Sequence, residues 1–180
     1  MKVLLFDTET TGLVGNSQLP VEAQPHVIEF YGHVCVFGPS QWETISELEF
    51  LCKPPVSLQP IITKITGLTD LDLRRQPPFK EYVQQIQALM QMADCIVAHN
   101  LQFDVDMLNI EAKRLGIEWA WPKRKVCSIE ASEHLKGHRL NLMNLHIELF
   151  GEGFKEAHRA RNDVHALTRC YGKMLEMEMV

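Results

Sequence analysis

The stretch VLLFDTETTG, residues 3–12, has the pattern that decides the fold. Its first half is apolar on both sides, because Val3 and Leu5 point one way from an extended chain while Leu4 and Phe6 point the other. Strands that are buried on both faces are typical of sheets covered by helices. We therefore predict that residues 3–6 form a doubly buried strand.

Apolar patterning along the rest of the chain predicts that strands come first as a meander and then alternate with helices. Strands are expected at about 26–37, 47–52, 95–98 and 125–129, and helices at about 79–93, 101–115, in two shorter segments after 129, and around 167–174. This order favours an α/β fold, a mixed five-stranded sheet flanked by helices. We see no repeat or linker, so we expect a single domain over residues 1–180.

The composition is that of a globular protein. The chain has 180 residues, of which 46 % are apolar and 23 % charged. Its five cysteines form no CxxC pair, which argues against a disulfide framework or a cysteine-based zinc site and suits a reducing compartment. No run of residues approaches the ~18 apolar residues of a membrane helix. We therefore expect a soluble, cytoplasmic protein with no membrane association.

The charge balance excludes a general polyanion binder. The net charge is −5 and the sequence pI is about 5.9, so any attraction to nucleic acid must be local. Two divalent cations held by acidic residues would bring the sum close to neutrality. Lys123–Lys125, with Lys136 and Arg139, form a modest basic segment, for which a solvated loop is the favoured interpretation.

Four carboxylates fall where apolar residues are expected. Asp7 and Glu9 are two apart at the end of the first strand and share one face of the sheet. Asp104 and Asp163 lie on the apolar stripes of their helices. Taken singly, each has an ordinary structural explanation as a helix cap or a strand-end turn. All four together favour one shared site, and oxygen ligands without cysteine are those that magnesium and manganese select.

Histidines near these acids offer a base for such a site. His158 lies five residues before Asp163, and a histidine side chain can accept a proton near neutral pH, although a lone histidine is more often a packed or surface residue.

His134 and His138 are spaced for zinc on a helix. Gly137 weakens that helix and no third ligand is evident, so surface histidines are the favoured interpretation there.

Three segments together resemble the motifs of one family, the DnaQ-like (DEDDh) 3′–5′ exonucleases. The segments are FDTETTG at 6–12, VAHNLQFD at 97–104 and HRARND at 158–163. ITGLT at 65–69 and the segment 126–131 are similar to the family's turn segment and later strand. The resemblance runs from residue 3 to about residue 175, and the three motifs stand in the family's order.

The resemblance implies an RNase H-like fold and a two-metal nuclease site using Mg²⁺ or Mn²⁺. Asp7, Glu9 and Asp163 would hold the ion that activates water, Asp7 would bridge to the second ion, and Asp104 would assist directly or through water. His158 would be the general base. Arg159 occupies the place of the tyrosine that a related subclass uses, which indicates the histidine subclass.

The resemblance also implies where the terminal nucleotide binds. The backbone from Thr10 to Leu13 would receive it, Leu13 would abut the last base, and Ile65 and Phe103 would form apolar walls. The remaining predicted substrate-binding residues are Thr8, Gly12 and Asn100. Thr66 stands where the family often has a histidine. Because the chain ends at Val180, directly after the last predicted helix, we expect a free-standing nuclease rather than stable attachment to a polymerase.

The sequence thus predicts release of 5′-mononucleotides from the 3′ end of DNA, preferably single-stranded. Two alternatives stay open at this point. One is a 3′–5′ exoribonuclease that trims RNA ends. The other is an inactive nucleic-acid-binding module, against which the intact set of four acids and a histidine argues.

Overall fold

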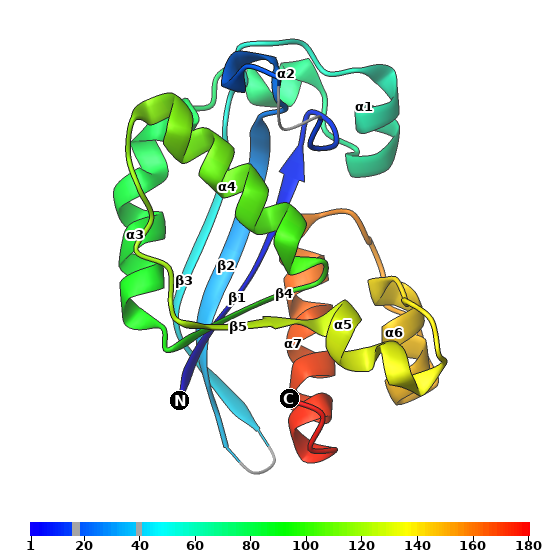
Figure 1. The fold of residues 1–180 in the computed structure, drawn as a ribbon. Helices are drawn as coiled ribbons and strands as arrows, with labels where there is room; N and C mark the ends of the chain where they lie inside the picture. Colours follow the sequence, from blue (N-terminus) through cyan, green and yellow to red (C-terminus); the bar gives the residue numbers. More distant parts are fainter. Residues whose placement is uncertain (16–18, 39–40) are drawn as a thin grey trace.

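The computed structural model describes residues 1–15, 19–38 and 41–180, and these form one five-stranded mixed sheet. The strands are β1 (Lys2–Thr10), β2 (Val27–Phe37), β3 (Trp42–Leu51), β4 (Cys95–Ala98) and β5 (Arg124–Cys127), in the spatial order β3-β2-β1-β4-β5. β1 pairs antiparallel with β2, which pairs antiparallel with β3, whereas β4 runs parallel to β1 and β5 parallel to β4 (Figure 1). The predicted mixed five-stranded sheet flanked by helices is confirmed.

The helices occupy both faces of the sheet and one end of the molecule (Figure 1). They are α1 (Pro60–Thr66), α2 (Asp70–Leu73), α3 (Val83–Met92), α4 (Leu101–Leu115), α5 (Ser128–Ser132), α6 (Leu142–Phe150) and α7 (Ala160–Glu176). Three 3₁₀ turns accompany them, at Val21–Ala23, Phe79–Tyr82 and Glu133–Leu135.

Several predicted boundaries are corrected by the structure. The third strand begins at Trp42 rather than near residue 47, because its first half is an exposed, polar edge without a buried face to mark it. The predicted helix at 79–93 is a 3₁₀ turn followed by α3, and the predicted strand at 125–129 ends at Cys127, where α5 takes over. The short helices α1 and α2 were not predicted, although Gly67, at φ 74°, ends α1 as helix-stop glycines do.

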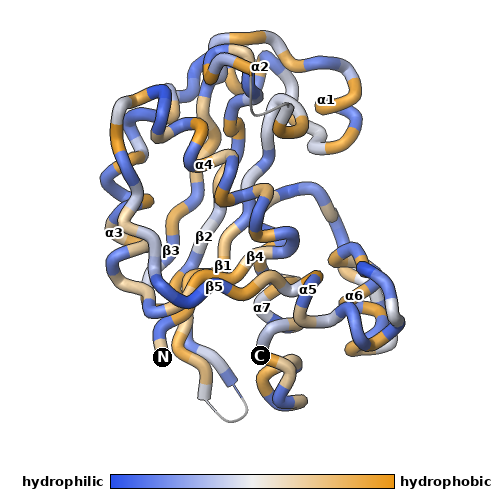
Figure 2. The backbone as a smooth tube through the Cα atoms, viewed as in Figure 1, coloured by the Kyte–Doolittle hydropathy of each residue, from blue (hydrophilic) through white to orange (hydrophobic). Residues whose placement is uncertain are grey.

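The first strand separates two apolar layers, as its pattern predicts. Leu4 and Phe6 pack in a core with α3 and α4, whereas Val3 and Leu5 pack in a second core with α6 and α7. Figure 2 shows the hydrophobic colour concentrated along β1 and β4 in the middle of the molecule. Each fully buried leucine of these cores contributes about 1.5–3 kcal/mol to folding. The doubly buried strand is a rigid platform for the polar residues at its end.

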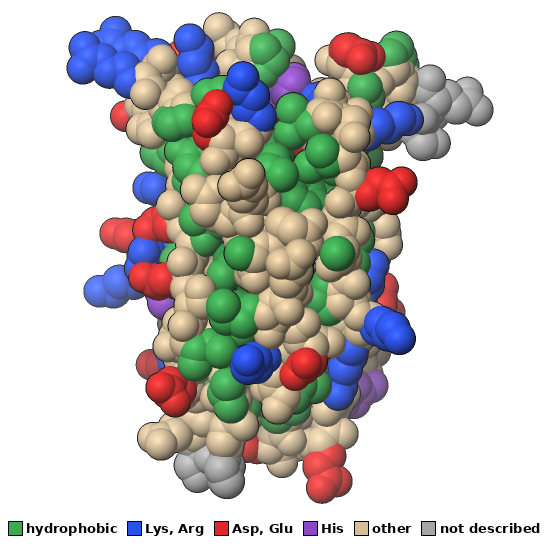
Figure 3. All heavy atoms as spheres, turned by 90° about the vertical axis from the view of Figure 1, so that its left-hand side faces the viewer, with side chains coloured by type: hydrophobic (Ala, Val, Ile, Leu, Met, Phe, Trp, Pro, Cys, Tyr) green, Lys and Arg blue, Asp and Glu red, His purple; other side chains and the backbone are tan. Residues whose placement is uncertain are grey.

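The surface carries no broad basic face on the side of α3. Figure 3 shows acidic and basic side chains interspersed there with hydrophobic ones, as the net charge of −5 leads one to expect. In the described part of the chain, no helix combines the length and apolar character needed to cross a membrane.

Candidate active site

The carboxyl ends of two parallel strands bring the four predicted acids to one place. β1 carries Asp7 and Glu9 near its end, Asp104 lies in the first turn of α4, which follows β4, and Asp163 lies in the first turn of α7. Since β1 and β4 are parallel neighbours, the residues that follow them meet at the same edge of the sheet. All four acids line one pocket.

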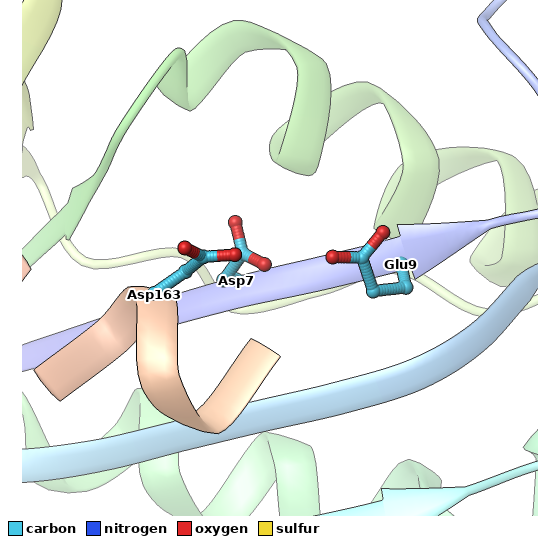
Figure 4. Close-up of side chains that lie close together, drawn as sticks. All are labelled: Asp7, Glu9 and Asp163. Carbon is cyan, nitrogen blue, oxygen red and sulfur yellow. The ribbon is translucent and has the colours of Figure 1, made fainter. Parts of the chain in front are cut away.

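Three of these carboxylates face one another closely. Asp7, Glu9 and Asp163 each offer one oxygen, and the three oxygens lie within 4.8 Å of one another. Figure 4 shows the two side chains of β1 and that of Asp163 directing their carboxylates into the same space. A set of hard oxygen donors without sulfur or nitrogen is what Mg²⁺ and Mn²⁺ prefer. The residues present therefore fit a divalent cation.

Asp104 accepts two hydrogen bonds from Thr8. Its Oδ1 accepts a 3.0 Å hydrogen bond from the Thr8 backbone N–H and a 2.7 Å bond from the Thr8 hydroxyl. The Asp104 side chain is almost fully buried. The Thr8 hydroxyl, which the sequence assigned to substrate binding, is thus engaged in orienting an acid.

Burial raises the pKa values of all four acids, and nearby like charges add to this effect at Asp7, Glu9 and Asp163. Burial raises the pKa of Asp7 well above its usual value, and the nearby charges of Asp104 and Glu9 raise it further. Burial also raises the pKa of Glu9 to about 8 and that of Asp163 to about 6. Burial raises the pKa of Asp104 to about 7 despite the opposing hydrogen bonds from Thr8. A bound cation would offset these penalties, because it favours the charged forms.

His158 lies at the rim of the same pocket, immediately before α7. Its backbone N–H donates a 2.8 Å hydrogen bond to Oδ2 of Asp163, and its φ of 68° is in the left-handed region that non-glycine residues seldom adopt. The side chain is exposed and lines the pocket beside Asp7 and Asp163. An exposed imidazole beside an acidic cluster can exchange protons with water.

The predicted substrate-binding residues divide into two groups. Thr8, Asn100 and Phe103 line the pocket together with the acids. Thr10 and Gly12 lie outside its lining, and the Thr10 hydroxyl donates a 2.7 Å hydrogen bond to the Gly12 carbonyl. Leu13 and Ile65 are also outside the lining, and Leu13 is 84 % exposed.

Sequence reasoning missed the opposite wall of the pocket. Asn141, Leu142, Met143, Phe154 and Ala157 line the pocket from the start of α6 and the segment before α7, and His99, which directly follows β4, lines it as well. Asn141 caps α6, accepting a 2.8 Å hydrogen bond from the Asn144 N–H, and an asparagine before an apolar helical run was a signal for that cap. Its place beside the acids depends on tertiary packing.

The described residues do not support the alternative of a zinc site at His134 and His138. Among the described residues, the groups of three or more His, Cys, Asp or Glu side chains close enough to hold a metal reduce to the trio of Asp7, Glu9 and Asp163. His134 and His138 belong to no such group.

Comparison with known proteins decides the family. The model of the RNase T exonuclease family matches residues 4–171. The chain belongs to this exonuclease family. The prediction of a DnaQ-like 3′–5′ exonuclease is therefore confirmed at the level of the family.

Two of the sequence relatives that the chain matches are bacterial DNA polymerase III proteins. The chain is 28 % identical over 173 residues to DNA polymerase III subunit epsilon of Treponema pallidum, a match that covers 94 % of the chain and 74 % of that subunit. It is 31 % identical over 179 residues to a PolC-type DNA polymerase III of Bacillus cereus, covering 96 % of the chain and 11 % of that polymerase. The chain thus spans about a tenth of the PolC-type relatives that it matches.

Solved structures share the fold at low sequence identity. The nuclease domain of 3′hExo, a DEDDh family member bound to rAMP, superimposes with a TM-score of 0.76 at 15 % identity, covering 98 % of this chain and 92 % of that one. Exonuclease X in complex with 5′-overhanging duplex DNA has a TM-score of 0.69 at 18 % identity, covering 97 % and 92 %. These likenesses confirm the RNase H-like exonuclease fold that the motifs implied.

Proposed function

We propose that this exonuclease releases 5′-mononucleotides from the 3′ end of DNA, preferably single-stranded, with two Mg²⁺ or Mn²⁺ ions. The observation that carries the proposal is the convergence of Asp7, Glu9 and Asp163, whose oxygens lie within 4.8 Å of one another beside His158. An inactive binding module has no need of such a costly cluster of buried acids.

The acids would hold the ions. Asp7, Glu9 and Asp163 would hold one ion, Asp7 would also contact the second, and Asp104 would assist from its place beside Thr8. When bound, such a pair of ions activates a water molecule and stabilises the oxygen that leaves phosphorus.

The other residues supply the base and the shape of the pocket. His158 accepts the proton of the attacking water, and Asp163 holds the His158 backbone through the 2.8 Å hydrogen bond. Phe103 and Phe154 provide apolar surface for the terminal nucleotide. Contacts of this kind tolerate any base, so little sequence preference is expected. The pocket has a volume of about 300 Å³, which has room for one nucleotide.

The sequence relatives favour DNA over RNA. The matched relatives are subunits or segments of DNA polymerase III. An exoribonuclease is the second candidate, because two structures of the same fold are a 3′-exonuclease recognising a histone mRNA stem-loop and the 3′hExo domain with rAMP. Their identities of 14 % and 15 % support the fold alone, so DNA is preferred.

End-labelled oligonucleotides test the proposal. A single strand labelled at its 5′ end should shorten stepwise with Mg²⁺ or Mn²⁺, and the same strand labelled at its 3′ end should release labelled mononucleotide at once. A 3′-blocked strand is the matched control and should persist. An internal-cut ladder from the blocked strand would overturn the proposal, and faster cutting of an RNA strand of the same sequence would transfer it to RNA.

A further inference from the structure

A buried glutamate holds the residue that follows His158. Glu29 lies on β2, directly opposite Glu9 of β1 in the register of the sheet, and its side chain is 1 % exposed. The Arg159 guanidinium binds the Glu29 carboxylate through two of its nitrogens, in a forked arrangement. Nε lies 3.1 Å from both carboxylate oxygens and Nη2 lies 2.8 Å from Oε1. Paired bonds of this kind fix both distance and orientation.

The same carboxylate also reaches the start of α7. Glu29 Oε2 accepts a 3.4 Å hydrogen bond from the backbone N–H of Ala160, the first residue of that helix. Glu29 thus satisfies an N–H that the helix leaves unpaired, and it places negative charge at the positive end of the helix. The buried Glu29 side chain therefore joins strand β2 to the first turn of α7.

Arg159 and Ala160, which Glu29 binds, lie in the sequence between His158 and Asp163, the two candidate active-site residues near the start of α7. His158 immediately precedes Arg159, and Asp163 is four residues after it. The His158 backbone has a strained φ of 68°, and it is tied to Asp163 through its N–H. A backbone in such a region persists only where its surroundings hold it. Arg159 itself does not line the pocket, so its influence passes through its neighbours.

We propose that Glu29 and Arg159 are positioning residues, which fix His158 and Asp163 against the acids of β1. The inference rests on the proposed function and adds to it two residues that do not touch the substrate. The Arg159 fork anchors the backbone on one side of His158, and the Ala160 bond sets where α7 begins. Because Glu29 stands opposite Glu9, the same contact aligns α7 with the strand that carries Asp7 and Glu9.

A second arginine–glutamate pair provides a matched control. Arg161, two residues further along α7, pairs with Glu49 on β3, with a 2.9 Å bond from Nε to Oε2. Both of these side chains are about 40 % exposed, and neither lines the pocket. This pair has the same chemistry at the same end of the same helix without the buried junction.

Steady-state kinetics of four variants test the inference. Arg159→Gln should lower kcat by roughly 10–100-fold while KM changes by less than about threefold, because geometry is lost but the nucleotide pocket remains. Arg159→Lys keeps the charge without the fork, and it should recover part of kcat. Arg161→Gln should leave kcat unchanged. The double variant Glu29→Gln/Arg159→Gln removes the unpaired buried charge, so its thermal midpoint should recover while its kcat stays low.

Amide hydrogen exchange supplies a direct structural readout. The His158 N–H should lose protection in Arg159→Gln and keep it in Arg161→Gln. The inference is overturned if folded Arg159→Gln keeps the kcat of the unaltered protein, or if kcat follows the thermal midpoint through all variants and recovers in the double variant. Absence of 3′-end activity in the unaltered protein would instead count against the proposed function.

Discussion

Buried acids in two regions of this molecule have different kinds of partner. Glu111 contacts a cation and an N–H donor, whereas Asp7 and Glu9 face another acid. Near the start of β2, Glu111 of α4 accepts hydrogen bonds from Arg114 at 2.9 Å and from the backbone N–H of Val27 at 3.0 Å, with His26 at 3.5 Å. At the end of β1, Asp7 and Glu9 face Asp163 instead. Throughout residues 1–15, 19–38 and 41–180, no lysine or arginine forms an ion pair with any acid of this trio.

The difference separates a structural acid from a functional cluster. Burial of a carboxylate is tolerated where a cation and N–H donors satisfy it, as they do for Glu111. The trio has no such cation of its own, and burial with mutual repulsion raises the pKa values of its members. The fold therefore supplies Glu111 with its own cation, Arg114, and the proposed function assigns to the trio an ion from solution.

The largest expected effect distinguishes the two groups by activity. Asp7→Asn should reduce kcat by roughly 10³-fold or more, because several kcal/mol of transition-state charge stabilisation depend on the bound ions. Glu111→Gln should leave kcat nearly unchanged in the fraction that is folded. Single-turnover rates on a 5′-labelled strand measure both. Equal losses of kcat in the two variants would contradict the distinction between the structural acid Glu111 and the trio.

A somewhat smaller loss is expected for the base. His158→Gln should lower kcat by about 10²–10⁴-fold, the usual contribution of general base catalysis, while Mn²⁺ binding is retained. His134→Gln is the matched surface control and should be as active as the unaltered protein. Full activity of His158→Gln would remove His158 from the mechanism.

Removal of the cation that pairs with Glu111 should lower the stability of the protein rather than its catalytic rate. Arg114→Ala leaves Glu111 buried without its cation, so the free energy of unfolding should fall by about 3–5 kcal/mol. Urea denaturation followed by circular dichroism measures this change. Arg169→Ala, which breaks an exposed pair with Glu152, is the control and should cost less than about 1 kcal/mol. A change of similar size in both variants would show that burial of Glu111 is not decisive.

The acidic cluster also predicts a pH dependence of the stability of the metal-free protein. The raised pKa of Glu9, from 4.5 to about 8, means that the folded state binds more protons than the unfolded state between these values. Stability should therefore fall as pH rises from about 5 to 8 and level off above, and Mg²⁺ should stabilise more at pH 8 than at pH 6.

Thermal midpoints in a chelating buffer measure this trend. Glu9→Gln carries no titrating group at that position, so its midpoint should depend less on pH over the same range. A steeper dependence in Glu9→Gln would contradict the assignment of the effect to the acidic cluster.

Much of the site could be predicted because it follows from periodicity along single elements. The alternation of a strand puts Asp7 and Glu9 on one face, and helical spacing puts Asp104 on the buried side of α4. Asp163 likewise falls on the apolar stripe of its helix, so all four acids predicted one shared site, and the motif order then pointed to the same residues. The structure confirms the strand, the sheet and the convergence.

The rest depends on contacts that no local pattern encodes. Glu29 and Arg159 are 130 residues apart and meet only because β2 pairs with β1 and α7 packs beneath both. Phe154 enters the pocket from a segment without periodic apolar spacing. Leu13 and Ile65 were placed by resemblance alone, and their contact with a nucleotide stays a prediction, because both side chains lie outside the pocket lining.

Titration calorimetry with Mn²⁺ tests the central claim most directly. The unaltered protein should bind Mn²⁺ at pH 8, Glu111→Gln should bind it equally well, and Asp7→Asn should lose most of that binding. Undiminished Mn²⁺ binding by a folded Asp7→Asn protein would contradict the account.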